Sequence, residues 1–258
     1  GGPFEAPHNK RMTLAFLATF GLIVGSFLNV VIARLPERRS LLGRSACPEC
    51  GEEVRAYDNI PLLSFALLRG RCRWCQRPIS WRYPLVELAT AAAMVGVYVR
   101  FGLTPAFGAA GALIAALIAV TAIDLQHQVI PHLITLPGIV VGLIVSPLTG
   151  LTQGWDAVIG VIVCGGALLA VVLATAWMSP IGGMGYGDPM LSAMLGAFLG
   201  WRLGLFALLV AVLVGGLVGA GLLLSGRRGR KDPIPFGPFL ALGGAAALLV
   251  DPPSVLGL

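Results

Sequence analysis

Charged side chains are scarce in this sequence. Asp, Glu, Lys and Arg make up only 12% of its 258 residues, about half the share found in an ordinary soluble domain. Long polar stretches are also rare. Apolar runs that are long enough to span a bilayer follow one another along most of the chain. These shortages exclude a soluble globular core, and we expect an all-α polytopic membrane protein. Its partner is then the lipid bilayer and not nucleic acid, although the net charge is +6.

Eight apolar runs are predicted to be transmembrane helices. Their ranges are 13–33, 84–101, 105–124, 130–148, 155–178, 188–200, 203–224 and 235–250. The sixth run is short, so a merger with the seventh is the main alternative. Residues 1–12 are predicted to be a disordered tail or a cloning remnant. Residues 34–83 are too long for a simple connector and are predicted to form a small module, and residues 84–250 form a second membrane domain.

Basic residues are distributed unevenly along the chain. Residues 34–83 contain ten arginines and residues 227–231 contain four more basic residues, which leaves four of the 18 Lys and Arg elsewhere. With eight spans and both termini outside, those fourteen lie on one side of the membrane. Because Lys and Arg accumulate in cytoplasmic loops, we expect that side to be the cytoplasm. Loops 124–129 and 179–187 then also face the cytoplasm.

Four of the five cysteines form two CxxC pairs in the polar module, at Cys47, Cys50, Cys72 and Cys75. Two such pairs can complete a tetrahedral, all-thiolate zinc site. Two disulfides are the alternative, but a cytoplasmic loop lies in a reducing compartment. We therefore predict a zinc-ribbon-like module with a structural zinc ion, because a closed four-sulfur shell leaves no position for water and metal binding supplies folding energy.

Three acidic residues lie in or beside apolar spans on the predicted cytoplasmic side: Glu87, Asp124 and Asp188. A carboxylate there is costly, so each is a candidate functional group. Each also has a structural alternative. Asp188 precedes Pro189 and suits the N-cap of a helix, and Asp124 suits a polar span boundary. Glu87 is a candidate substrate contact, or else a partner of a loop arginine such as Arg82.

Two carboxyl groups that meet in a partly dry site share one proton. The ionised member can then take a proton from water while the protonated member donates to a carbonyl oxygen, as in aspartic proteases. The sequence has no serine–histidine pattern and no HExxH helix that would compete. The alternatives are a membrane transporter or a scaffold with a zinc-ribbon loop. A transporter predicts acids near the bilayer midplane, whereas Asp124 and Asp188 lie near one edge.

Several motifs together resemble one family. In chain order they occupy residues 25–30, 34–36, 47–50, 59–62, 72–75, 82–88, 123–125, 183–188 and 233–238. Over residues 20–245 the sequence resembles the type IV prepilin peptidases (leader peptidase and N-methyltransferase), which are GxGD-type membrane aspartyl proteases. The resemblance implies that Asp124 and Asp188 are the catalytic pair and that residues 84–250 are a transmembrane protease domain. It also implies a bacterial inner-membrane enzyme that removes the basic leader of type IV prepilins or type II secretion pseudopilins at the cytoplasmic face.

The resemblance further implies N-methylation of the new N-terminus with S-adenosylmethionine, an activity associated with residues 34–83 and with Gly70. Supporting roles are predicted for Gly185 and Gly187, which let the backbone approach a substrate closely. Pro235 and Gly237 are predicted to form a broken helix entry near the active site, the alternative being a simple turn.

The sequence departs from the family pattern at His132, where the family usually has aspartate, and at Met190, where it usually has lysine. An acid and a base are therefore both missing near the predicted site.

Overall fold

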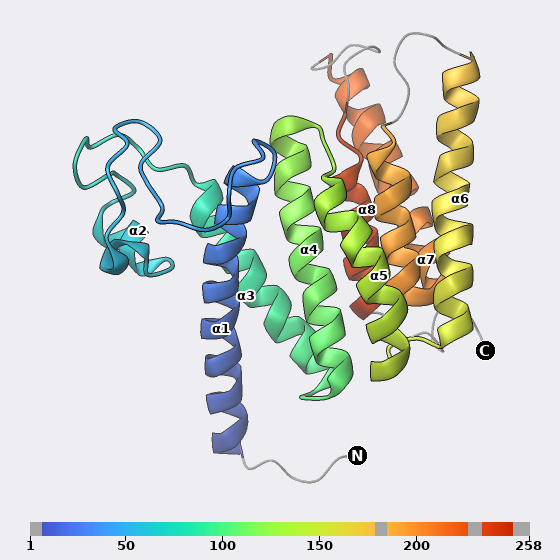
Figure 1. Cartoon of the computed structure of the whole chain (residues 1–258), viewed down its shortest axis with the longest axis horizontal. Helices are drawn as coiled ribbons and strands as arrows, with labels where there is room; N and C mark the ends of the chain where they lie inside the picture. The colour runs from blue at the N-terminus through green and yellow to red at the C-terminus, as the bar shows by residue number, and fades with distance from the viewer. Residues whose placement is uncertain (1–6, 179–184, 227–233, 250–258) are drawn as a thin grey trace. The chain divides into compact units, whose positions relative to one another are not determined.

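The computed structural model describes residues 7–178, 185–226 and 234–249, and within these ranges the regular elements are all helices (Figure 1). Two isolated β-bridges are the only extended pairing there. The predicted all-α class is therefore confirmed. Segments 1–6, 179–184 and 227–233, which include part of the predicted glycine-rich approach and the second basic segment, lie outside the described residues. The chain divides into two compact units, Gly1–Val99 and Arg100–Leu258, which are described separately.

The first unit is built on two antiparallel helices, α1 (Pro7–Arg34) and α3 (Arg82–Phe101). Their backbones approach closely at two glycines one helical turn apart. A Cβ added at Gly21 would lie 2.6 Å from the Cα of Ala91, and one at Gly25 would lie 2.7 Å from the Cα of Glu87. Small residues at this spacing are typical of membrane helix pairs. Helix α1 starts earlier than the predicted 13–33, because Pro7 suits a first helical turn.

A largely irregular module connects these two helices. It contains the 3₁₀ helix η1 (Ala56–Asn59) and the short helix α2 (Leu63–Leu67). The Arg34 guanidinium, at the end of α1, donates hydrogen bonds to the carbonyl oxygens of residues 40 and 42–44. Arg34 thus organises the first part of the module by pairing its backbone acceptors, a role that could not be read from the sequence.

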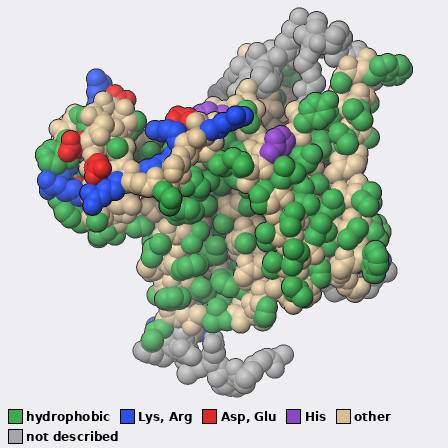
Figure 2. Space-filling view, in the orientation of Figure 1, with side chains coloured by type: hydrophobic (Ala, Val, Ile, Leu, Met, Phe, Trp, Pro, Cys, Tyr) green, Lys and Arg blue, Asp and Glu red, His purple; other side chains and the backbone are tan. Residues whose placement is uncertain are grey.

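The second unit is a helical bundle. Its helices are α4 (Pro105–His127), α5 (His132–Thr149), α6 (Gly154–Met178), α7 (Gly187–Leu224) and α8 (Gly237–Leu249) (Figure 1). The short turns between successive helices make α4, α5 and α6 alternate in direction. The side chains at 133, 136, 140 and 144 form an exposed apolar stripe on α5, and Figure 2 shows hydrophobic side chains over this face of the bundle. Such a surface suits lipid contact.

Helix α7 reverses direction at Gly200. The φ and ψ of Gly200 are 75° and 175°, which no helix contains. A Cβ added at Gly204 would lie 3.5 Å from the Cα of Gly196, although eight residues of straight helix span about 12 Å. The element is therefore a hairpin with a first arm, 187–199, and a second arm, 201–224. The first arm is almost entirely buried and forms the centre of the bundle.

Six of the described helices are long and apolar enough to cross a membrane, with α7 counted once, and α8 is shorter. The eight predicted spans correspond to α1, α3, α4, α5, α6, the two arms of α7, and α8. The difference in number arises because the first arm and α8, at 13 residues or so each, extend only about 20 Å. That length is less than the hydrocarbon core of about 30 Å.

Candidate active site

Asp124 lies in the last turn of α4. The helix ends immediately afterwards at Gln128, whose φ of 53° is left-handed and whose N–H donates to the Asp124 carbonyl at 2.9 Å. The Asp124 residue is only 4% exposed. Its carboxyl Oδ2 accepts a hydrogen bond from the backbone N–H of Gly237 at 2.9 Å. The start of α8 thus holds the carboxyl group of α4 in one orientation.

Asp188 lies in the first turn of α7 and is 7% exposed. The N-cap of that helix is Tyr186, which makes no side-chain capping bond, so Asp188 is not the N-cap that the sequence offered as an alternative. Its N–H donates to the carbonyl of Gly185 at 3.3 Å. Its Oδ1 is buried and has no hydrogen-bond partner among the described residues. A buried polar atom without a partner is uncommon outside functional sites.

The two carboxyl groups lie close enough to interact electrostatically. Their elements meet through Gly187, because a Cβ added there would lie 2.7 Å from the Cβ of Ile130, in the turn after α4. Only glycine allows the start of α7 to come this close. The bundle thus brings together the two aspartates, which are 64 positions apart in the chain. Two buried carboxyl groups that interact electrostatically titrate as a coupled pair, which is the arrangement that aspartic proteases use.

The other predicted residues of this end of the bundle fall into two groups. Gly187 and Gly237 touch the neighbours that position the aspartates. Gly185 is exposed, and Pro235 lies in the non-helical stretch that leads into α8. His132 and Met190 begin α5 and α7 at the same end, and both are exposed and not buried with the pair.

Glu87 belongs to the first unit and has a different environment. It is 7% exposed, and its Oε2 accepts a hydrogen bond from the Leu62 N–H at 2.9 Å. The Ser26 hydroxyl also hydrogen-bonds to it. Leu62 has a φ of 59°, a strained value for a non-glycine residue. Glu87 therefore ties the module to α3, a contact that the sequence could not reveal because the donor is a backbone group.

The two CxxC pairs lie in turns of the same design. The Gly51 N–H donates to the Cys47 carbonyl at 2.9 Å, and the Gln76 N–H donates to the Cys72 carbonyl at 3.1 Å. Gly51 and Gln76 both have positive φ, 72° and 58°. The matched turns direct all four sulfurs of the pairs to one point, and these atoms lie within 4.8 Å of one another.

The sulfur geometry fits a metal ion. Cys47 Sγ and Cys75 Sγ are 3.8 Å apart, and zinc–sulfur bonds of about 2.3 Å in a tetrahedron require sulfur–sulfur edges of about 3.8 Å. All the described cysteines are free of disulfides. The four-cysteine cluster can therefore hold a metal ion.

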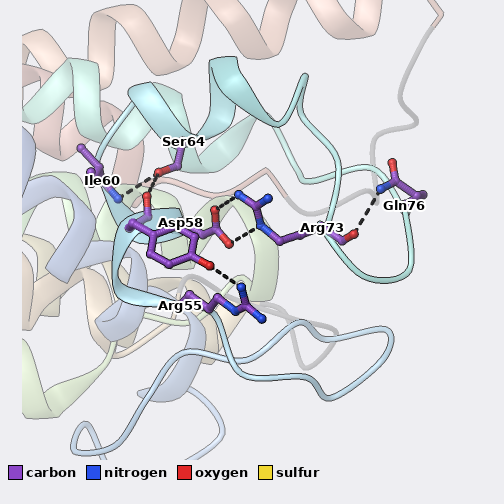
Figure 3. A network of polar contacts seen from close by, with 7 residues as sticks. Arg55, Asp58, Ile60, Ser64, Arg73 and Gln76 are labelled. Atoms are coloured by element: carbon purple, nitrogen blue, oxygen red, sulfur yellow. Dashed lines mark hydrogen bonds and ion pairs between the residues drawn. The ribbon is translucent and has the colours of Figure 1, made fainter.

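A polar network fixes the second CxxC turn to the rest of the module (Figure 3). Arg73, between the second pair of cysteines, donates two hydrogen bonds to the Asp58 carboxylate at 2.8 and 2.6 Å. These bonds hold the pKa of Asp58 below its ordinary value. The Ser64 hydroxyl donates to the Tyr57 carbonyl at 2.8 Å and accepts from the Ile60 N–H at 3.1 Å. The network joins η1, α2 and the metal-binding turn, and no sequence motif indicated it.

Gly70, the remaining predicted residue, lies between α2 and the second CxxC turn. Its φ is +66°, and an added Cβ would lie 3.1 Å from the ring of Phe65. A side chain at this position would therefore be strained and would displace the Phe65 ring.

The buried carboxyl groups of an apolar helical bundle and the four-cysteine module fit the class of intramembrane aspartyl proteases better than a transporter or a scaffold. The comparisons with known proteins agree. Residues 19–101 match the bacterial peptidase A24 N-terminal domain, and residues 111–220 match the type IV leader peptidase family. The chain belongs to the type IV leader peptidase family.

Three relatives share most of their length with this chain, and each is named a prepilin leader peptidase/N-methyltransferase. The protein of Burkholderia pseudomallei (strain 1026b) is 42% identical over 95% of this chain and 88% of its own length. The protein of Aeromonas hydrophila is 43% identical over 92% and 90%, and that of Pseudomonas aeruginosa is 40% identical over 89% and 87%. No solved structure matches the chain. The transporter and scaffold alternatives are not favoured by these matches.

Proposed function

We propose that this chain removes the basic leader peptide of type IV prepilins or type II secretion pseudopilins at the cytoplasmic face of a bacterial inner membrane. The observation that carries the proposal is the meeting of two buried carboxyl groups, Asp124 and Asp188, at one end of an apolar bundle. Membership of the type IV leader peptidase family supports it, as do the names of the relatives.

The proposed chemistry uses the two aspartates as a proton-sharing pair. The ionised carboxylate takes a proton from a water molecule, and the oxygen of that water attacks the carbonyl carbon of the scissile peptide bond. The protonated carboxyl group donates to the carbonyl oxygen, so that a neutral tetrahedral intermediate forms. When the carbon–nitrogen bond breaks, the departing amine takes the proton of the protonated carboxyl group, and a hydroxyl group of the intermediate returns one proton to the pair.

The relatives are named N-methyltransferases as well as leader peptidases, which supports methyl transfer as a second step. S-adenosylmethionine, when bound, would supply a methyl group to the deprotonated new N-terminal amine and would leave as S-adenosylhomocysteine. We assign this step to the module of residues 34–83, with Gly70 in a supporting role. Zinc is the metal proposed for Cys47, Cys50, Cys72 and Cys75. It would hold the two CxxC turns together and take no part in bond breaking, because four thiolates complete its coordination.

The test is cleavage of a prepilin by purified variants, with the product mass as the readout. Asp124→Asn and Asp188→Asn should each abolish leader removal while leaving expression and membrane insertion unchanged. Asp156→Asn is the matched control. Asp156 is an acid at the opposite end of the bundle, beside Gly200, and its replacement should leave cleavage intact. Cleavage that persists in either of the first two variants would refute the assignment.

A further inference from the structure

A cavity of about 610 Å³ lies in the first unit, between α2 and the start of α3. Its wall is mainly apolar and includes Phe65, Trp81 and Leu88, while two arginines, Arg69 and Arg71, also line it. Neither the proposed proteolysis nor the metal site uses this cavity, and of the residues given a role in the proposed methyl transfer only Gly70 lines it. Its volume is within the range of ligand-binding pockets.

The two arginines are presented to the cavity by an ordered turn. Arg69 and Gly70 both have positive φ, 51° and 66°. The Gly70 N–H donates to the Phe65 carbonyl at 2.8 Å, and the Ile79 N–H donates to the Gly70 carbonyl at 2.7 Å. These hydrogen bonds fix the backbone at Gly70, and Arg69 and Arg71 lie on either side of it in the cavity wall. No acidic residue is among the described residues that line the cavity, so the only charged side chains on its wall are the two arginines.

The apolar wall continues onto a membrane helix. Leu88 belongs to α3, which is long and apolar enough to span a bilayer, and it is 49% exposed. Trp81, immediately before α3, is 71% exposed. Tryptophan at the end of a membrane helix is typical of the headgroup region. This placement suits the level where headgroups meet the hydrocarbon core, with the two arginines on the headgroup side and the apolar wall along α3.

We propose that this cavity binds an anionic phospholipid, with its phosphate between Arg69 and Arg71 and its acyl chains along α3. Basic pockets at the ends of membrane helices attract such headgroups. The other two molecules that the proposed function brings to this chain fit the cavity less well. A prepilin leader is basic, and S-adenosylmethionine carries two cationic groups against one carboxylate, so the net charge of each is unfavourable beside the two arginines.

Lipid binding would give the module a function at the membrane surface. The lipid would hold the turn that contains Gly70 against the start of α3, and a substitution at Gly70 would act through the shape of the cavity. This proposal does not depend on the aspartyl chemistry, because every residue that it uses lies in the first unit.

The test is native mass spectrometry of the full chain in neutral detergent, titrated with phosphatidylglycerol or phosphatidylcholine. Wild type should prefer phosphatidylglycerol by about tenfold or more, since each cation near a phosphate contributes several-fold in affinity. The double variant Arg69→Gln/Arg71→Gln should lose this preference. Ala66→Phe should lose it too, because Ala66 lines the cavity and a phenyl ring there fills it while both arginines remain.

The matched control is Arg38→Gln/Arg77→Gln, which removes two exposed arginines of the same module that do not line the cavity. It should keep the preference for phosphatidylglycerol. Metal content serves as the folding check for every variant. Equal loss of preference in both double variants would overturn the proposal, and so would retention in Ala66→Phe. Displacement of the lipid from wild type by S-adenosylmethionine, or by soluble glycerol 3-phosphate, would also overturn it by assigning the cavity to that molecule.

Discussion

At the scale of single residues, one backbone hydrogen bond orients the Asp124 carboxyl group. Its donor is Gly237, and a Cβ added to Gly237 would lie 2.7 Å from Asp124 Oδ2. We predict that Gly237→Ala displaces this carboxyl group and lowers the rate of leader cleavage by about a hundredfold, because misplacement by about 1 Å can cost that much. The measurement is the rate of prepilin cleavage under single-turnover conditions.

The control for this variant is Gly216→Ala. Gly216 lies in the second arm of α7, and an added Cβ there would meet no atom within 4 Å, so helix stability should be unchanged or slightly higher. Cleavage by Gly216→Ala should match that of wild type. If Gly237→Ala also cleaves at the wild-type rate, the Gly237 hydrogen bond does not position a carboxyl group that cleavage depends on.

The residue-scale features differ in how far the sequence reveals them. Asp124 and Asp188 could be predicted as candidates, because an acid at the edge of an apolar run is conspicuous. The Gly237 donor could be predicted only as a general support, since a backbone N–H has no side-chain signature and lies 113 positions from its acceptor. The acceptor role of Glu87 toward Leu62 was not predictable for the same reason.

At the scale of elements, the two CxxC turns bring four sulfurs together at one candidate metal site. We predict that Cys50→Ser lowers the zinc content from about one ion per chain to almost none, because structural zinc needs all four thiolates. The module should then become sensitive to proteases, since zinc binding contributes on the order of 10 kcal/mol to the folding of such domains. Elemental analysis and limited proteolysis measure the two effects.

Cys164→Ser is the natural comparison, because Cys164 is buried in α6 and is not part of the four-cysteine cluster. It should retain zinc and a protease-resistant module. A Cys50→Ser protein that still carries one zinc ion per chain would show that three cysteines suffice or that the ligands lie elsewhere.

The α7 hairpin shows what the sequence can specify about an element. The apolar runs 188–200 and 203–224 were predicted as separate spans, and the two arms of α7 occupy those ranges. The reversal occurs at Gly200, where the positive φ needs glycine and an added Cβ would meet Thr152 Oγ1 at 2.7 Å. The sequence contains 35 glycines, so composition could not indicate which of them makes the turn.

At the scale of the whole molecule, the helix order determines which residues can meet. Helices α4 to α6 and the arms of α7 alternate in direction, so Asp124, at the end of α4, and Asp188, at the start of α7, lie at the same end of the bundle. This much follows from counting spans. The sequence could not predict which helices are neighbours, because that depends on close contacts such as Gly243 of α8 against Ala207 of α7.

The orientation in the membrane is the remaining whole-molecule prediction, and the ten arginines of residues 34–83 determine it. Alkaline phosphatase is a suitable reporter, because its disulfides form only outside the cytoplasm. We predict activity in fusions made after Leu103 and Leu151, and none in fusions after Leu42 and Val129. Fluorescent-protein fusions at the same junctions should show the opposite pattern. Phosphatase activity after both Leu42 and Val129 would place the module and the Asp124 end of the bundle outside the cytoplasm. The leader peptides of prepilins would then not reach the aspartates from the cytoplasmic side.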